Sequence, residues 1–203
     1  MISLTDVTSR FKASLLDSVR SFDDAAYPRH IQAAMAALNA VRPQHLVTVV
    51  SLVAGRSLYP CPQKLTAIHA CWWGRSAKYH TEPWADHHPG RLPEWSIANN
   101  EAGVRFLRAM PAPTAWQINS LGSECELEYH ADHVLTDTEC TLSAEDLDLL
   151  IVRAQAEAMR EVSMKNVTTA YQLRESIGST PNNGTPAYLY TQLMAEFERR
   201  AGR

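Results

Sequence analysis

Apolar positions between residues 143 and 165 predict a long helix with two apolar stripes. Ser143 and Asp146 have the spacing of a capping box, and Leu142 and Leu147 that of a hydrophobic staple, so we expect the helix to begin here. The stripes consist of Leu147, Leu150, Ile151, Ala154, Ala158 and Val162, and of Leu149, Val152, Ala156 and Met159. Because two stripes need two partners, we expect one to pack on helices of this chain and the other on a sheet or a neighbouring subunit.

Similar periodicity predicts two helices before residue 44. The first begins at a capping box formed by Ser3 and Asp6 and is expected to end near Asp23. The second has Pro28 as its first residue and stops before Pro43. Their apolar faces contain Val7, Phe11, Leu15 and Phe22, and Ile31, Ala34, Met35, Leu38 and Val41.

A last helix is predicted near the C-terminus. Residues 178–184 are typical of a linker, after which Thr185 provides a cap and Pro186 a first helical residue. We expect the apolar side chains of this helix to point inward, namely Leu189, Leu193, Met194 and Phe197.

Between these helical segments the pattern changes to short runs rich in β-branched and aromatic residues. These runs predict strands at 46–53, 65–73, 95–98, 104–110, 115–121 and 124–131. Strands that follow each other without intervening helices favour an antiparallel sheet or a small sandwich. We expect the strand at 65–73 to be buried on both faces, and residues 74–94, which contain three prolines and two glycines, to form a long loop.

Together these elements predict an α+β fold in a single domain of 203 residues. The expected parts are a helical layer from 1–44 and 143–177, an inserted β region at 45–131 with its long loop at 74–94, and a linker with a C-terminal helix at 178–203.

Composition narrows the functional classes. The net charge of −3 argues against tight, sequence-independent binding of nucleic acid. The chain has no leader pattern and no apolar window that spans a bilayer, so we expect an intracellular product without a membrane partner. The four cysteines are dispersed in a chain of this size, which favours reduced thiols.

A group of potential metal ligands lies in the β region, although their spacing is not typical of zinc sites. The group contains Cys61, His69, Cys71, His80, Asp86, His87 and His88. In a regular strand His69 and Cys71 share a face, but zinc sites usually contain tightly spaced ligand pairs such as CxxC. We therefore favour a buried thiol and a structural imidazole, and keep a zinc-binding module or metal-dependent enzyme as the alternative.

No phosphate-binding glycine loop, nucleophile elbow, HExxH or EF-hand pattern is present in the sequence. We therefore expect no enzymatic activity, no catalytic residues and no cofactor. Of the five tryptophans, Trp84 in the long loop is the best candidate for an exposed binding residue, and the others fit packing of the sheet.

Residues 124–131 alternate between acidic and apolar side chains. Glu124, Glu126 and Glu128 share one face, whereas Cys125 and Leu127 belong to the other. The acidic face is interpreted either as an ordinary solvated face or as the wall of a conduit that repels a phosphate backbone.

The order of these segments resembles that of the head-to-tail adaptor (connector) proteins of tailed bacteriophages. The resemblance covers nearly the whole chain and is carried by RHIQAAMAALNAVRP at 29–43, LVAGRSLYPCP at 52–62, VRFLRAMPAPTAWQINSL at 104–121, ELEYHA at 126–131 and LSAEDLDLLIVRAQAEAM at 142–159.

The resemblance implies a structural role in the virion neck, after assembly in the host cytoplasm. Copies of the chain are expected to form a homo-oligomeric ring, a dodecamer by this likeness, which joins the portal to tail or neck proteins. DNA would pass through the ring without specific binding, along a channel faced by Glu124, Glu126 and Glu128. Candidate portal or tail contacts are Tyr188, Tyr190, Met194, Phe197, Arg199 and Arg200 in the C-terminal helix, and Trp84, His87 and His88 in the long loop.

Overall fold

The fold is α+β in a computed structural model that describes residues 2–15, 22–167 and 185–202. The described helices are α1 (Leu4–Ser14), α2 (Ala26–Val41), α3 (Arg75–His80), α4 (Ala115–Leu121), α5 (Ala144–Val167) and α6 (Pro186–Ala201). The described strands are β1 (Gln44–Ser51), β2 (Leu58–Pro60), β3 (Leu65–Cys71), β4 (Glu94–Asn99), β5 (Arg105–Met110) and β6 (Glu124–Ala131).

The chain divides into two compact units. Residues 1–43 and 133–203 form the helical unit, and residues 44–132 form the strand unit. We expected one domain with an insertion at 45–131; the insertion is a compact unit with its own hydrophobic core. The expected linker at 178–184 lies outside the described residues.

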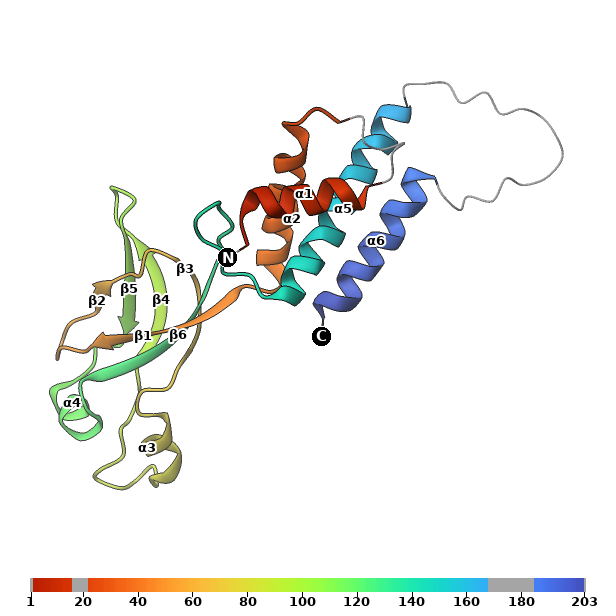
Figure 1. The fold of residues 1–203 in the computed structure, drawn as a ribbon. Coiled ribbons are helices and arrows are strands. Elements are labelled where there is room, and N and C mark those ends of the chain that lie inside the picture. The colour runs from red at the N-terminus through yellow and green to blue at the C-terminus, as the bar shows by residue number, and fades with distance from the viewer. Residues whose placement is uncertain (1, 16–21, 168–184, 203) are drawn as a thin grey trace, which may run out of the picture. The chain divides into compact units, whose positions relative to one another are not determined.

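Helix α5 is the central element of the helical unit, with α1 and α2 on one side and α6 on the other (Figure 1). Its start follows the sequence prediction, because the Asp146 N–H donates to Ser143 Oγ over 3.1 Å. The core of this unit contains Val7, Phe11, Leu15, Phe22, Tyr27, Ile31, Leu38, Leu147, Leu149, Leu150, Met159 and Phe197, together with several alanines.

The second stripe of α5 packs inside the helical unit, with Leu149, Ala156 and Met159 buried and Val152 half-buried, so the expectation that a sheet or a neighbouring subunit covers it is wrong. Leu149 and Ala156 of that stripe are 1% and 0% exposed. On the same side of α5, Arg153 contacts Met194 Sδ and lies over the ring of Phe197, 5.6 Å from its centroid. The C-terminal helix therefore covers the stripe that we expected to contact a sheet or a neighbouring subunit.

The N-terminal helices differ from the prediction at their ends. The capping box of Ser3 and Asp6 is present, but α1 ends at Ser14 because Leu15 adopts an extended backbone conformation. Leu15 is still buried in the core of the helical unit. Helix α2 begins at Ala26, which puts Pro28 within the first turn rather than at the first position.

A buried imidazole lies where α2 meets α5. His30 is 4% exposed, and its Nε2 is 3.3 Å from Glu161 Oε2. Burial lowers the pKa of His30 below its ordinary value, and the nearby charge of Arg29 acts in the same direction, whereas Glu161 opposes the shift. The pKa of Glu161 is also lowered, first by its bond to Lys165 and then by its bond to Arg29.

The strand unit contains two three-stranded antiparallel sheets, in the orders β1–β6–β3 and β2–β5–β4 (Figure 1). One core joins both sheets, with Tyr59 and Leu107 from one and Cys125, Leu127 and Tyr129 from the other. The expected small sandwich is therefore present. Strand β6 is central in its sheet, since β1 pairs with it from Gln44–Ala131 to Ser51–Glu124 and β3 pairs with its other edge.

Three predictions within the strand unit are wrong. Residues 115–121 form helix α4 rather than a strand, because Thr114 and Gln117 make a capping box that starts a helix. The segment 74–94 is not a continuous loop, since α3 occupies its beginning. Strand β3 is largely exposed rather than buried on both faces, because it is an edge strand of a sheet that has only one covered face.

We predict that Phe197→Ala destabilises the helical unit by about 3–5 kcal/mol, because it removes a buried ring from the contact between α5 and α6. Urea unfolding followed by circular dichroism measures the change. The matched control is Glu198→Ala on the exposed side of α6, which we expect to stay within about 0.5 kcal/mol of the parent. Equal stability of the two variants would show that α6 contributes little to the core.

We also predict that stability falls as the pH drops below about 6.5. The unfolded chain binds a proton at His30 near its ordinary pKa, whereas the folded protein binds it only at lower pH, so acid favours the unfolded state. His30→Gln should reduce the loss in melting temperature between about pH 7.5 and pH 5.5. His80→Gln, which changes an exposed imidazole on α3, should leave that loss unchanged.

Candidate functional site

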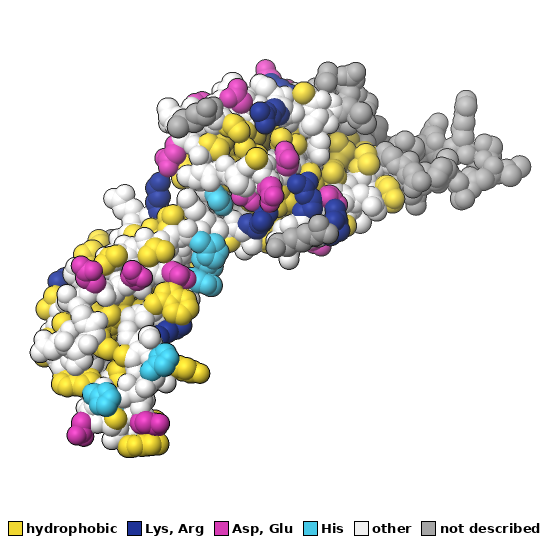
Figure 2. All heavy atoms as spheres, turned by 60° about the horizontal axis from the view of Figure 1, so that its bottom comes forward, with side chains coloured by type: hydrophobic (Ala, Val, Ile, Leu, Met, Phe, Trp, Pro, Cys, Tyr) yellow, Lys and Arg dark blue, Asp and Glu magenta, His cyan; other side chains and the backbone are white. Residues whose placement is uncertain are grey.

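The outer face of the β1–β6–β3 sheet carries an acidic stripe, which we define as Glu124, Glu126 and Glu128. The alternation expected from the sequence is present, since Cys125 and Leu127 are both 0% exposed on the opposite face. Figure 2 shows a row of acidic side chains with histidines at one end. This face is acidic and open to solvent, whereas a position along a channel stays a prediction.

Exposed valines of β1 lie beside the acidic stripe. Val47 is opposite Glu128 and Val49 is opposite Glu126 in the β1–β6 ladder. The two valines are 62% and 55% exposed. The strand therefore presents branched apolar side chains to solvent beside carboxylates. Exposed apolar surface with a polar rim is typical of a site that binds a partner protein.

Three imidazoles from three strands meet at the end of the acidic stripe. We call His45, His69 and His130 the histidine cluster; their ring centroids are 4.4 Å apart for His45 and His130, 5.1 Å for His69 and His130, and 5.4 Å for His45 and His69. Burial lowers the pKa of His130, and the neighbouring imidazoles His45 and His69 lower it further. Sequence analysis missed this cluster, because its three histidines are distant in sequence and come together only through the pairing of β1 and β3 with β6.

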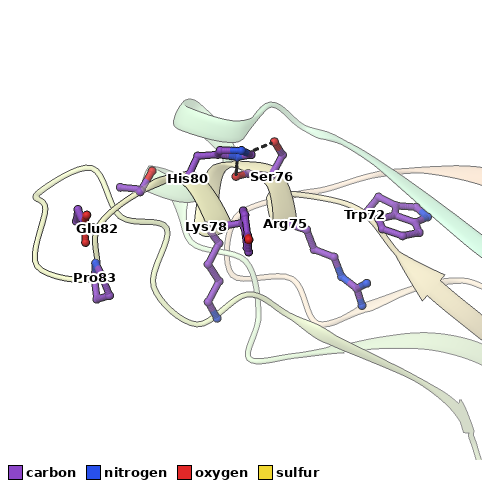
Figure 3. A pocket seen from close by; sticks show the side chains of 9 residues that line it. Trp72, Arg75, Ser76, Lys78, His80, Glu82 and Pro83 are labelled. Carbon is purple, nitrogen blue, oxygen red and sulfur yellow. Dashed lines mark hydrogen bonds between the residues drawn. The ribbon is translucent and has the colours of Figure 1, made fainter.

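Residues around α3 form an open groove of about 860 Å³ (Figure 3). It is lined by Trp72, Arg75, Ser76, Lys78, Tyr79, His80, Thr81, Glu82 and Pro83. The guanidinium of Arg75 lies over the ring of Trp72, 5.1 Å from its centroid. Trp72 and Tyr79 are 52% and 87% exposed, so the groove combines aromatic surface with positive charge.

The loop that follows α3 is attached to the strand unit by a buried amide. Gln117 of α4 is 5% exposed, and its Nε2 donates to the carbonyl oxygens of Pro89 and Arg91 over 2.9 and 3.0 Å. Gly74 adopts a positive φ of 68°, and a side chain there would approach Leu121 and Leu92 too closely. Gln117 is a positioning residue that sequence analysis missed, although its capping-box spacing from Thr114 was a usable signal.

The candidate contacts of this loop are accessible. Trp84 is 81% exposed, and His87 is exposed. His88 is half-buried, and its Nδ1 accepts a hydrogen bond from the Gly90 N–H over 3.0 Å.

The candidate contacts of α6 are divided between surface and core. Tyr188 is 38% exposed, and Arg199 is exposed and bound to Glu196. Tyr190, Met194 and Arg200 are half-buried. Phe197 is 4% exposed and belongs to the core, so its inclusion among the portal or tail contacts is wrong.

The potential metal ligands do not come together. The β3–β6 pairing shifts register between Ile68 and Ala70, so His69 joins the histidine cluster outside while Cys71 points into the core. The Cys61 thiol donates to the Pro62 carbonyl oxygen. Across the residues that the structure describes, no three histidines, cysteines or carboxylates are placed to hold a metal ion. The zinc alternative therefore has no geometric support.

No protein-family model matches this chain, and a search of the curated proteins finds no match. None of the helices in the described part of the chain is long and apolar enough to cross a bilayer.

We predict that His45→Ala raises the pKa of His130, because it removes an imidazole whose positive charge opposes protonation of its neighbour. The ring resonances of His130 in an NMR pH titration measure the shift. His87→Ala, an exposed histidine in the loop after α3, should leave the His130 midpoint in place. An unchanged midpoint in His45→Ala would mean that His45 does not contribute to the lowered pKa of His130.

Proposed function

We propose that this protein is a structural subunit of the neck of a tailed phage, a head-to-tail adaptor that forms a homo-oligomeric ring below the portal. The ring extends the DNA channel and connects the capsid to the tail. The observation that carries the proposal is the aromatic surface of the strand unit, where Trp72, Tyr79 and Trp84 are 52%, 87% and 81% exposed. Large exposed aromatic side chains favour a partner protein, because they bury much area with little loss of side-chain freedom.

The helical unit does not provide the subunit interface that its sequence pattern indicated. Helix α6 covers the second stripe of α5, so that stripe is not a subunit interface. Assembly contacts are instead assigned to the groove around α3 and to the exposed Val47 and Val49 of β1, and the acidic stripe of β6 is left to the channel. A closed ring needs two different surfaces on each subunit, one for each neighbour, and the strand unit has two such surfaces.

The acidic stripe supports the channel part of the proposal. Glu124 and Glu126 are exposed, and nothing on the opposite strand neutralises them, because their partners in β1 are Ser51 and Val49. A wall of carboxylates repels phosphates within about 8 Å at physiological salt. DNA would then slide past the wall without being held.

The order of elements is the third support. The segments that carry the resemblance to phage adaptors correspond to α2, the turn before β2, β5 with α4, β6, and the first two-thirds of α5. The resemblance includes both units of the chain. It is the source of the proposed portal, tail and neck partners, of the dodecameric ring and of the location in the virion.

The direct test is to measure the mass of the purified protein by light scattering, alone and with the portal ring of the same phage, and to image the mixture by electron microscopy. We expect the protein to co-assemble with the portal into a longer ring. A protein that stays monomeric and does not bind the portal at any salt concentration would falsify the proposal.

We predict that Trp84→Ala weakens binding to the portal or tail by about 30-fold, the effect of a central aromatic contact worth about 2 kcal/mol. Trp116→Ala is the matched control, since Trp116 is a 43% exposed tryptophan on α4, outside the loop that contains Trp84. Both variants should fold normally, and affinity is measured by surface plasmon resonance. Equal affinities of the two variants would remove Trp84 from the contact.

A charge reversal tests the channel assignment. Rings that carry Glu124→Lys and Glu126→Lys should bind duplex DNA at about 50 mM salt and release it at several hundred millimolar, because lysines would then contact phosphates. The control with the same net charge carries Glu101→Lys and Asp86→Lys, two exposed positions away from the stripe. If both rings retain DNA equally in a filter-binding assay, the stripe does not line the channel.

A further inference from the structure

Two thiols lie in contact inside the strand unit. Cys71 is the last residue of β3 and Cys125 is the second residue of β6, and their Sγ atoms are 3.2 Å apart. Cys71 pairs with Leu127, and Cys125 lies two residues before Leu127 on the same face of β6. A disulfide needs about 2.05 Å between the sulfurs, and the remaining gap of about 1 Å is within reach of small side-chain rotations.

The two thiols have different surroundings. Cys125 is 0% exposed, whereas Cys71 is half-buried at the edge of the sheet. The bond from Cys125 lowers the pKa of Cys71 to about 6, and the backbone of Trp73, the indole of Trp95 and the charge of Arg75 lower it as well, against the effect of burial. The same bond and burial raise the pKa of Cys125. Ionisation of the pair is therefore favoured at Cys71, which is the half-buried partner, over Cys125.

An orphaned donor points to the same assignment. The indole N–H of Trp95 is buried and has no geometrically complete hydrogen bond in the described structure. A buried donor without an acceptor is unfavourable. Ionisation of Cys71 places a negative charge near this N–H and thereby reduces that cost. Reactive cysteines lie in such partly exposed, electropositive surroundings, and redox-sensitive ones have a second thiol beside them.

We propose that Cys71 and Cys125 form a peroxide-sensitive dithiol that closes to an intrachain disulfide. The Cys71 thiolate attacks one oxygen of hydrogen peroxide, the O–O bond breaks, and Cys71 sulfenic acid and hydroxide form. The Cys125 sulfur then attacks the Cys71 sulfur, the S–O bond breaks, and water leaves with the thiol proton. The two thiols are oxidised, and one peroxide is reduced to two waters overall.

The site is specific to this pair of cysteines. Cys61 donates its thiol to the Pro62 carbonyl oxygen, and Cys140 packs against the core of the helical unit. The disulfide would join residues 54 positions apart and fasten edge strand β3, whose pairing with β6 has two register shifts, to the centre of its sheet. The inference does not depend on the proposed role in a phage neck.

The experiment treats the reduced full-length protein with hydrogen peroxide at neutral pH, followed by intact mass and non-reducing peptide mapping. We expect a product lighter by one pair of hydrogen atoms, with a cross-linked peptide that contains Cys71 and Cys125, and full reversal by dithiothreitol. Cys61→Ser, the matched control, should form the same disulfide at the same rate. A cross-link that involves Cys61 or Cys140, or no cross-link at all, overturns the proposal.

The order of the two steps is tested with Cys125→Ser. Peroxide should then leave a sulfenic acid on Cys71 that dimedone traps, whereas dimedone adducts on another cysteine contradict the proposal. A second measurement needs no variant: in the native protein, alkylation of Cys71 by iodoacetamide should reach half its maximal rate at lower pH than that of Cys61. Equal pH profiles would overturn the assignment of Cys71 as the attacking thiolate.

Discussion

The strand unit depends on the register of β6 between its two neighbours. Paired on both edges, this strand directs Cys125, Leu127 and Tyr129 into the core and the acidic stripe to solvent. A slip of one residue would bury carboxylates and expose the core, so the hydrophobic effect holds this register firmly. The acidic stripe, the histidine cluster and the thiol pair all follow from this one alignment.

Strong periodicity explains which elements were predictable. The bounds of β6 and the start of α5 follow from strict alternation and from a cap, two signals that do not depend on distant residues. Segment 115–121 has apolar residues that fit either period over seven positions, and only its Thr114 cap distinguished a helix. Helix α3 is shorter still and has no buried residue, so it produced no apolar pattern at all.

The sites were harder to predict than the fold, because they combine residues that are distant in sequence. His45, His69 and His130 come from three strands, and the thiol pair joins positions 54 residues apart. The metal hypothesis grouped His69 with Cys71 on the assumption of a regular strand. A register shift next to His69 separates the two side chains onto opposite faces, and a shift of this kind has no clear signature in one sequence.

The groove around α3 and the thiol pair are adjacent in the strand unit. The large exposed aromatic side chains around α3 lie within residues 44–132 and therefore belong to the strand unit. Trp72, at the start of that groove, directly follows Cys71, and its N–H bonds to the Glu126 carbonyl oxygen next to Cys125. A disulfide between Cys71 and Cys125 would therefore fix the backbone from which Trp72 and Arg75 extend. The proposed redox state of this pair would then act on the groove through one short stretch of chain, residues 71–75.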